Sequence, residues 1–286
     1  MSAARIIVLT TLAMLAFAGN SLLCRLALQD TAIDAASFTS IRLVSGAMVL
    51  CLIVAVRRNL PAGKGNWPSA LALFAYAAGF SFAYISLPAA TGALLLFGAV
   101  QATMIGFGLY AGERLQSAQW LGLVLALAGL VGLLLPGLSA PPLAGSLLML
   151  GAGVAWGIYS LRGKGAGDPT RVTSGNFLRS VPLALVMSLL LPDQAVFDSA
   201  GFWYAVASGA LASGMGYAIW YRVLPALKAT NAATLQLSVP VIAAVGGVLL
   251  LGEPITPRLL LASVAILGGI ALVILGKERR LSALRE

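Results

Sequence analysis

The side chains best suited to contact a ligand in this chain are amides that stand inside long apolar stretches. Asn20, Gln101 and Gln236 are each surrounded by aliphatic and small residues, and Gln101 lies within the segment Phe-Gly-Ala-Val-Gln-Ala-Thr-Met of residues 97–104. A polar group removed from water is costly unless it finds a partner, and an internal cavity can provide one. We therefore interpret these amides as candidate contacts for a small molecule.

Aromatic residues accompany these amides at helical spacing. Tyr76 and Phe80 are four residues apart and so share a helix face, Trp156 stands one turn before Tyr159, and Tyr217 lies in another apolar stretch. Tyrosine and tryptophan combine apolar area with a polar tip, which suits a pocket for amphipathic metabolites. The alternative interpretation is packing between helices or anchoring at a membrane interface.

Two arginines, Arg42 and Arg179, stand inside apolar stretches of their own. A charge at membrane depth normally faces a cavity or a partner, and a planar guanidinium binds a carboxylate with two hydrogen bonds. The competing role is structural, in which each arginine caps backbone carbonyls or extends to the interface. Because the two arginines occupy matching places in the two halves of the chain, and a small molecule is rarely symmetric, we favour the structural role.

Two glutamates, Glu113 and Glu253, each end an apolar stretch directly after a glycine. We expect them to be structural and to accept hydrogen bonds from the start of the next helix, where the helix dipole favours a carboxylate. No acidic residue lies in the middle of an apolar stretch, and the chain has no histidine. A proton-coupled exporter of cations would need such a buried acid, and a metal site usually needs histidine, so we expect neither of these, no cofactor and no catalytic residue.

These side chains must be positioned by membrane-spanning helices. The chain has 286 residues, of which 60% are hydrophobic and 9% charged, far fewer charged residues than the ~25% of a soluble domain. Stretches of about 20 apolar residues cross a bilayer as helices, and the sequence predicts ten of them, at residues 6–28, 36–56, 67–87, 89–111, 117–135, 143–161, 172–191, 200–221, 228–251 and 258–275. The predicted fold is an all-α integral membrane protein.

The two halves of the chain resemble each other. Leu-Tyr-Ala-Gly-Glu at 109–113 corresponds to Leu-Leu-Leu-Gly-Glu at 249–253, and Phe-Ala-Gly-Asn-Ser-Leu at 17–22 corresponds to Trp-Gly-Ile-Tyr-Ser-Leu at 156–161. A repeated unit with an odd number of spans must enter the membrane in opposite orientations, as in many secondary transporters. We therefore predict two inverted five-helix repeats, residues 1–138 and 139–286, within one membrane domain.

The basic residues predict the orientation of these helices. With both termini in the cytoplasm, nearly all lysines and arginines outside the spans fall on the inner side, and only Arg25 and Arg258 lie at the outer side. Positive charge collects in the cytoplasmic loops of membrane proteins, so the formal charge of +9 reflects orientation and not nucleic-acid binding. We expect a multi-pass protein of the bacterial inner membrane.

Taken together, the two five-helix halves, the Gly-Glu after the fourth and ninth spans and the arginine in the second span resemble the EamA-type members of the drug/metabolite transporter superfamily. The resemblance covers essentially the whole chain. It implies a metabolite exporter whose pathway is lined by helices one, three, four, six, eight and nine, with helices five and ten at the periphery. The family often has proline in the middle of the fourth helix, as Pro240 stands in the ninth here, whereas this chain has Gln101.

The leading hypothesis is a secondary transporter that exports small metabolites, above all amino acids or related zwitterions, by alternating access at a central cavity. The alternatives are an exporter of amphipathic drug-like compounds, a channel, or a membrane protein that transports nothing. We expect the partners to be a small-molecule substrate and membrane lipid, and the protein to act as a monomer or a homodimer. The predicted substrate-binding residues are Asn20, Tyr76, Phe80, Gln101, Trp156, Tyr159, Tyr217 and Gln236.

Overall fold

Helices make up all the regular structure of the described residues in the computed structural model. These residues are 2–57, 63–112, 114–137, 140–163, 167–191, 198–227 and 235–283, with side chains to residue 275. The helices of the first half are α1 (Ala3–Asp30), α2 (Ala35–Val56), α3 (Trp67–Tyr84), α4 (Ala89–Tyr110) and α5 (Ser117–Leu134). The second half contains α6 (Leu143–Arg162), α7 (Pro169–Leu190), α8 (Ser199–Ala207), η2 (Ser208–Met215), α9 (Gly216–Val223), η3 (Leu224–Ala226), α11 (Ser238–Leu251) and α12 (Pro257–Ala283).

Capping residues fix where several helices begin, and they account for many of the acidic side chains. The carboxylate of Asp34 accepts hydrogen bonds from two backbone amides at the start of α2. Asp168 does the same for one amide of α7 and Asp198 for one amide of α8. An N-cap carboxylate satisfies amides that have no partner within the helix and also complements the helix dipole. These acids therefore lie at helix ends, away from the middle of the bundle.

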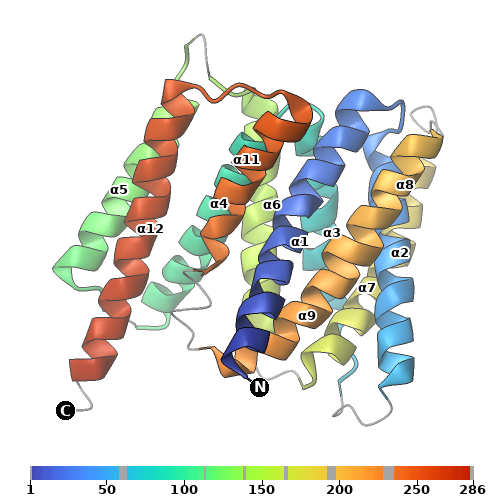
Figure 1. The fold of residues 1–286 in the computed structure, drawn as a ribbon, viewed down its shortest axis with the longest axis horizontal. Coiled ribbons are helices and arrows are strands. Elements are labelled where there is room, and N and C mark those ends of the chain that lie inside the picture. The colour runs from blue at the N-terminus through green and yellow to red at the C-terminus, as the bar shows by residue number, and fades with distance from the viewer. Residues whose placement is uncertain are drawn as a thin grey trace.

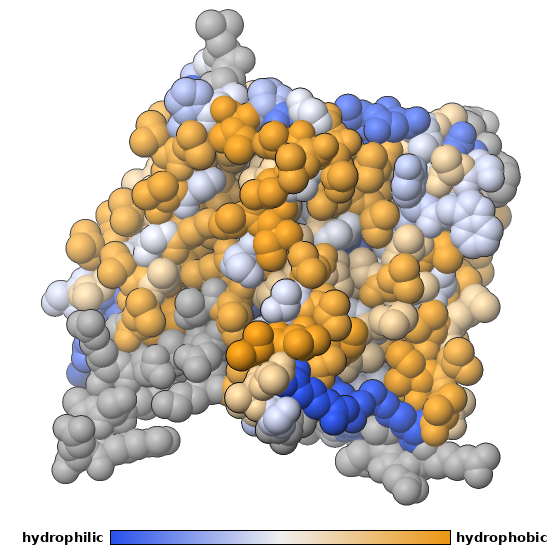
Figure 2. Space-filling model, in the orientation of Figure 1, coloured by the Kyte–Doolittle hydropathy of each residue, from blue (hydrophilic) through white to orange (hydrophobic). Residues whose placement is uncertain are grey.

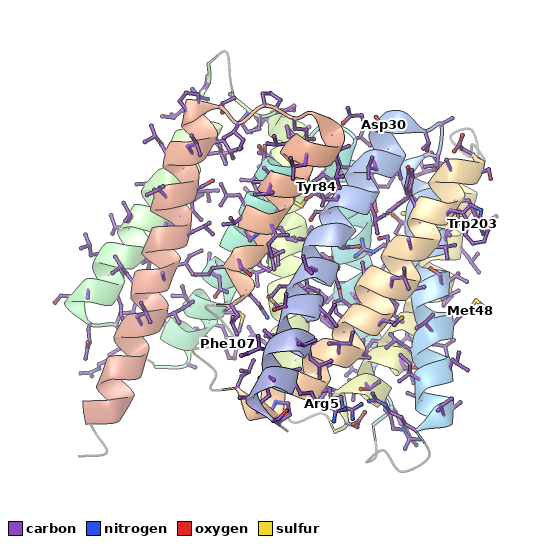
Figure 3. The ribbon with its side chains drawn as sticks, viewed as in Figure 1. Arg5, Asp30, Met48, Tyr84, Phe107 and Trp203 are labelled. Carbon is purple, nitrogen blue, oxygen red and sulfur yellow. The ribbon has the colours of Figure 1, made fainter. Side chains whose placement is uncertain are left out.

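The surface has the polarity expected of a membrane protein. Six of the described helices, α1, α2, α4, α5, α6 and α12, are long and apolar enough to cross a membrane. Figure 2 shows hydrophobic residues over most of one side of the molecule, with hydrophilic residues at its upper and lower edges. Large apolar side chains such as Met48 and Trp203 are 67% and 64% exposed and point outward (Figure 3). A bilayer is the environment in which such a surface is stable.

The helices divide into a main bundle and a peripheral pair. Helix α5 packs along α12 at one side of the molecule, apart from most other helices (Figure 1). Gly122 and Gly269 allow this close approach, because a Cβ on either would run into the backbone of the opposite helix. In the main bundle α3 and α4 pack against α6, α2 packs against α7, and α1 packs against α8, η2, α9 and α11.

One predicted span is continuous in the sequence but irregular in the structure. The stretch predicted as a single helix at 200–221 consists of α8, the π-helix η2 and α9. The small residues of η2 let it approach α2 closely, and a Cβ at Gly209 would collide with the backbone carbonyl of Arg42. The wide turns of a π-helix often occur at functional sites, and η2 carries Ser208 and Ser213 toward the middle of the bundle.

The fourth span is one continuous helix, whereas the helix described for the ninth span begins near its central proline. Helix α4 runs without interruption past Gln101, whereas Pro240 is the third residue of α11. Proline lacks a backbone amide and is therefore tolerated in the first turn of a helix, where that amide has no partner. The beginning of the predicted span 228–251 lies outside the described residues, and its end agrees with the end of α11 at Leu251.

Candidate functional site

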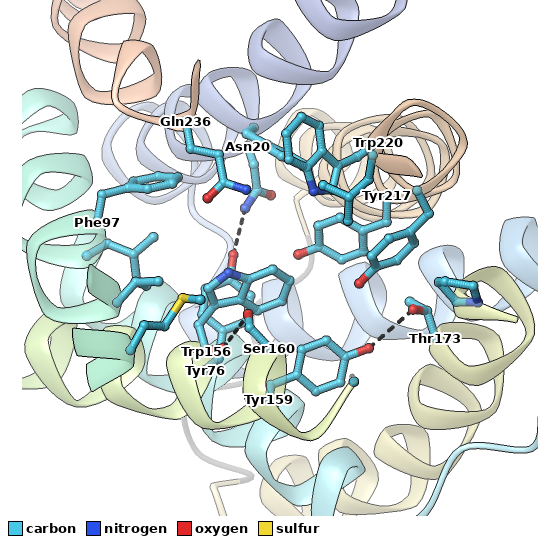
Figure 4. A pocket seen from close by; sticks show the side chains of 18 of the residues that line it. Asn20, Tyr76, Phe97, Trp156, Tyr159, Ser160, Thr173, Tyr217, Trp220 and Gln236 are labelled. Carbon is cyan, nitrogen blue, oxygen red and sulfur yellow. Dashed lines mark hydrogen bonds between the residues drawn. The ribbon is translucent and has the colours of Figure 1, made fainter. Parts of the chain in front are cut away.

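A cavity of about 490 Å³ lies among the helices of the main bundle (Figure 4). Its walls come from α1, α3, α4, α6, α7, η2 and α9, so the cavity is built from both halves of the chain. Helix α7 contributes as well, which the family resemblance did not imply. The structure brings all the predicted substrate-binding residues to this cavity: Asn20, Tyr76, Phe80, Gln101, Trp156, Tyr159, Tyr217 and Gln236.

Trp156 is the centre of an aromatic cluster in the cavity wall. Its ring stacks on those of Tyr159 and Tyr217, with centroids 5.2 Å apart in each case, and lies 4.8 Å from the ring of Tyr76. Phe80 extends the cluster beyond Tyr76. Aromatic pairs at such distances contribute beyond their buried area. Rings from α3, α6 and α9 thus hold one another in place around the space that a small molecule would occupy.

A hydrogen-bond network joins Asn20 and Tyr76 to the interior of the bundle. The Asn20 side-chain amide donates to the Tyr76 hydroxyl (3.3 Å), and its carbonyl oxygen accepts from Ser208 (2.6 Å). The guanidinium of Arg42 donates to the Tyr76 hydroxyl (3.0 Å) and, through Nε, to Ser213 (3.4 Å). The π-helix η2 therefore supplies both serines of a network that connects α1, α2 and α3.

A second polar group lies at the α6–α7 side of the cavity. The hydroxyl of Tyr159 donates to Thr173 (3.4 Å) and accepts from the amide of Asn176 (3.4 Å). The side-chain oxygen Oδ1 of Asn176 in turn accepts a hydrogen bond from the backbone amide of Asn66 (2.9 Å), a residue that precedes α3. Figure 4 shows Tyr159 pointing to Thr173 across the wall. The Tyr159 hydroxyl therefore has both an acceptor and a donor within the protein.

Gln101 and Gln236 line the cavity without a hydrogen-bond partner among the residues that the structure describes. Gln101 is 6% exposed and lies in the buried part of α4. Gln236 comes from the segment just before α11, and in Figure 4 it enters the cavity beside Asn20. An amide carries both donors and an acceptor, so these two side chains offer unused hydrogen-bonding capacity to a bound molecule.

The two arginines of the repeat do not have equivalent surroundings. Arg179 is half-buried and donates to the carbonyls of Lys64 (2.7 Å) and Gly175 (2.8 Å), which is the structural role that we expected for both. Arg42 is only 1% exposed, and its Nη1 has no hydrogen-bond partner. Arg179 therefore bonds backbone carbonyls, whereas Arg42 is buried with part of its guanidinium unpaired.

Of the two predicted structural glutamates, Glu113 lies outside the described residues. Glu253 forms a salt bridge with Arg25 (3.2 Å) and accepts from the backbone amide of Ala89 (2.8 Å) at the start of α4. We expected a hydrogen bond from the next helix along the chain, α12, and the structure gives one from α4 instead. The reason is that the end of α11 packs against α4 and so places Glu253 at the beginning of α4.

The cavity extends toward one edge of the bundle, and an ion pair lies at the opposite edge. Its lining includes Gly163 at the end of α6, Pro169 at the start of α7 and Leu227 after η3. At the opposite edge Arg25 binds Glu253 and also donates to the carbonyls of Tyr84 and Ile85. This group of contacts joins α1, α3, α4 and α11 at that edge.

Several residues of the site were not predicted as contacts from the sequence. Phe17, Thr173 and Asn176 line the cavity, and Ser208 and Ser213 support it through Asn20 and Arg42. The signal for the serines was the run of small residues at 208–216, which favours close helix packing. Among the described residues no group of three or more His, Cys, Asp or Glu side chains is placed to hold a metal ion.

The chain is similar to known proteins over most of its length. The chain is 58% identical over 281 residues to the uncharacterized protein PA1977 of Pseudomonas aeruginosa, covering 96% of this chain and 98% of that one. It is 28% identical over 250 residues to the uncharacterized transporter YwfM of Bacillus subtilis, with 84% and 82% covered. A solved crystal structure with 20% sequence identity has the same fold, with a TM-score of 0.66 over 96% of this chain and 98% of that chain.

One relative carries a substrate in its name. The threonine/homoserine exporter RhtA of Escherichia coli K12 is 32% identical to this chain over 168 residues, a segment that spans 57% of this chain and 56% of that protein. The EamA-like transporter family matches this chain twice, at residues 4–135 and 143–275, and this double match confirms the resemblance noted in the sequence. The chain is therefore a multi-pass membrane protein of the EamA-like transporter family.

Proposed function

We propose that this protein exports small zwitterionic metabolites, above all amino acids, across the bacterial inner membrane. The observation that carries the proposal is the composition of the cavity. Aromatic rings and free amides line it, a buried arginine stands behind it, and no carboxylate is among its lining residues in the part of the chain that the structure describes. A volume of about 490 Å³ lies within the range of small-molecule sites.

The charges of the cavity favour a zwitterion or an anion over a cation. Binding an organic cation at membrane depth requires a buried carboxylate as a counter-ion, and the described carboxylates lie at helix ends. The similarity to RhtA, whose name specifies threonine and homoserine, supports the amino-acid class. Amphipathic drug-like compounds remain the second candidate, because the aromatic cluster around Trp156 would also suit them.

Alternating access follows from the proposed architecture of ten spans in two inverted five-helix repeats, residues 1–138 and 139–286. The packing supports this architecture, because contacts recur when the halves are exchanged. Helices α3 and α6 pack together, and so do their counterparts α8 and α1; α4 packs on α6, and α11 packs on α1. Rocking of two such halves around a shared cavity would expose it to each side in turn.

We place both termini in the cytoplasm. Helix α1 begins and α12 ends at the lower edge in Figure 1, which is the edge with Arg5 in Figure 3. Arg162, Arg171 and Arg222 lie at the ends of α6, α7 and α9 that face the same side in the proposed topology, as the distribution of positive charge predicts for a cytoplasmic face. The cavity extends toward this side, so the described conformation is inward-facing.

Because one chain forms the whole cavity, a monomer suffices, and a homodimer would contain two separate cavities.

Efflux from proteoliposomes loaded with a panel of amino acids and amphipathic drugs tests this function. We expect wild-type protein to accelerate efflux of at least one amino acid. We expect the double variant Gln101→Ala/Tyr159→Ala to lose at least about 90% of that rate, because it removes a free amide and a stacked ring from the wall. Efflux of drugs alone would favour the second candidate. The proposed cavity would be contradicted by full transport in the double variant, and the proposed function by an inactive wild type.

The salt bridge between Arg25 and Glu253 is the proposed outer closure, and Glu253→Gln is expected to weaken it. Cys24 is buried and directly precedes Arg25 in α1, so its labelling reports on opening at this edge. In a Cys51→Ser background, a membrane-impermeant maleimide added outside should label Cys24 several-fold faster in Glu253→Gln than in the parent. Arg258→Gln is the matched control, because Arg258 bonds only the carbonyl of Leu135 at the same edge among the described residues. Equal labelling of Cys24 in all three proteins would contradict this role.

A further inference from the structure

The hydroxyl of Tyr76 accepts hydrogen bonds from two sides. Arg42 Nη2 donates to it at 3.0 Å, and a guanidinium can only donate. Asn20 Nδ2 donates to it at 3.3 Å. The orientation of the Asn20 amide follows from its other bond, because the 2.6 Å contact with Ser208 has the length of an O–H···O bond and is short for N–H···O. Asn20 therefore presents its oxygen to Ser208 and its NH₂ to Tyr76.

Two donors occupy the acceptor capacity of the Tyr76 oxygen and leave its own proton available. No acceptor for the Tyr76 hydroxyl exists among the described residues. Tyr76 is 5% exposed and lines the cavity, and Figure 4 shows its hydroxyl at the cavity beneath Asn20. A buried hydroxyl without an acceptor is costly. The Tyr76 hydroxyl is thus an oriented O–H donor in the cavity that can bind an acceptor atom of a ligand.

Arg42 makes this donor stronger, because its own charge is not neutralised. No carboxylate forms a salt bridge with it in the described part of the chain, and its Nη1 is buried without a hydrogen-bond partner. Its guanidinium carbon lies 4.8 Å from the centre of the Phe80 ring and 5.2 Å from that of Tyr76. Aromatic faces offset part of the cost of burying a cation. A positive charge in a medium of low dielectric favours an anion at the adjacent hydroxyl.

We infer that the Tyr76 hydroxyl, polarised by Arg42 and oriented by Asn20, is the subsite for the carboxylate of a zwitterionic substrate. The carboxylate accepts a hydrogen bond from the Tyr76 hydroxyl, keeps its negative charge and becomes the counter-ion that Arg42 lacks. Arg42 acts here as a positioning and charge-supplying residue behind the wall, not as a direct ligand. The free amides of Gln101 and Gln236 then remain for the ammonium group and side chain of the substrate. This inference rests on the proposed function and specifies which atom recognises the zwitterion.

Binding of L-threonine and of L-threoninamide to the purified full-length protein in nanodiscs tests the inference. The two ligands have the same side chain and ammonium group, and only the first has a carboxylate. Tryptophan fluorescence reports binding, because Trp156 and Trp220 both line the cavity, and calorimetry measures it independently. Because hydrogen bonds to charged groups are strong, we expect wild type to bind L-threonine at least about tenfold more tightly than the amide.

Tyr76→Phe removes only the hydroxyl and should reduce this preference to about twofold or less, mainly because the variant binds L-threonine more weakly. Tyr159→Phe is the matched control, because it keeps the stacked ring of the cavity wall and removes a tyrosine hydroxyl that bonds within the protein. It should keep the preference. Arg42→Lys keeps the charge and should keep a larger part of the preference than Arg42→Gln. If the Arg42 variants do not fold, the comparison of the two tyrosines still decides the question.

Equal affinity of wild type for the two ligands, or an unchanged preference in Tyr76→Phe, would overturn the carboxylate subsite while leaving amino-acid export intact. An equal loss of the preference in Tyr76→Phe and Tyr159→Phe would also overturn the carboxylate subsite, because such a result would assign recognition to the cavity as a whole. If wild type binds neither ligand and exports no amino acid in the proteoliposome panel, the proposed function fails, and the subsite fails with it. A preference lost in Tyr76→Phe alone supports the inference.

Discussion

Replacing Trp156 with alanine is expected to weaken substrate binding at least about thirtyfold, or ~2 kcal/mol, and to abolish measurable transport. Trp156 contacts the rings of Tyr76, Tyr159 and Tyr217, so its loss removes the central wall of the cavity and frees three side chains that it positions. Equilibrium binding of L-threonine in nanodiscs and its efflux from proteoliposomes measure the two effects.

Trp203→Ala is the matched control for this variant. Trp203 is 64% exposed and packs on Phe202 at the outer side of α8, away from the cavity. We expect it to reduce transport by less than about twofold, since surface substitutions have small effects. Comparable losses in Trp203→Ala and Trp156→Ala would mean that the aromatic cluster in the cavity has no special role in binding.

Gly209→Ala is expected to have the largest effect on stability. A Cβ at Gly209 would collide with the backbone carbonyl of Arg42 and with the Ser45 hydroxyl, so η2 and α2 would have to separate. Overpacking of this kind costs about 1–3 kcal/mol, and separation would also disturb the bond between Ser213 and Arg42. We expect a melting temperature several degrees below that of wild type, measured by thermal unfolding in detergent with size-exclusion detection.

Gly151→Ala tests whether the effect comes from the close contact and not from glycine itself. Gly151 is an exposed helical residue of α6, and a Cβ there would meet nothing within 4 Å. Alanine favours a helix over glycine by up to about 1 kcal/mol, so this variant should melt at or above the wild-type temperature. A Gly209→Ala protein as stable as Gly151→Ala would show that η2 and α2 are not as close as described.

The sequence could predict the helices and the helix faces of the site. Apolar length locates the helix ends to within a few residues, as for α2, predicted at 36–56 and described as Ala35–Val56. Polar and aromatic residues such as Asn20, Tyr76 and Gln101 are identifiable because few reasons other than a cavity place them at membrane depth. These local features depend on one helix at a time, and a single sequence contains them.

The sequence could not predict the features that depend on how helices meet. Arg42 and Arg179 occupy matching positions in the two repeats, yet Arg42 is the more deeply buried. The reason is that η2 approaches α2 and places Ser213 beside Arg42. The π-helix itself could not be predicted, because Ser208–Met215 lies within one continuous apolar stretch of the sequence. Likewise the end of α11 lies against the start of α4, which gives Glu253 its partners Arg25 and Ala89. Such contacts require the relative positions of several helices.

Counterflow in proteoliposomes tests most directly the central claim that this cavity carries an amino acid by alternating access. Vesicles are loaded with unlabelled L-threonine and diluted into a trace of the labelled compound. We predict a transient accumulation of label above equilibrium for wild type and Trp203→Ala, and none for Trp156→Ala. A channel gives no such accumulation, so a wild type without overshoot for any amino acid of the panel, or an overshoot that survives in Trp156→Ala, would contradict the account.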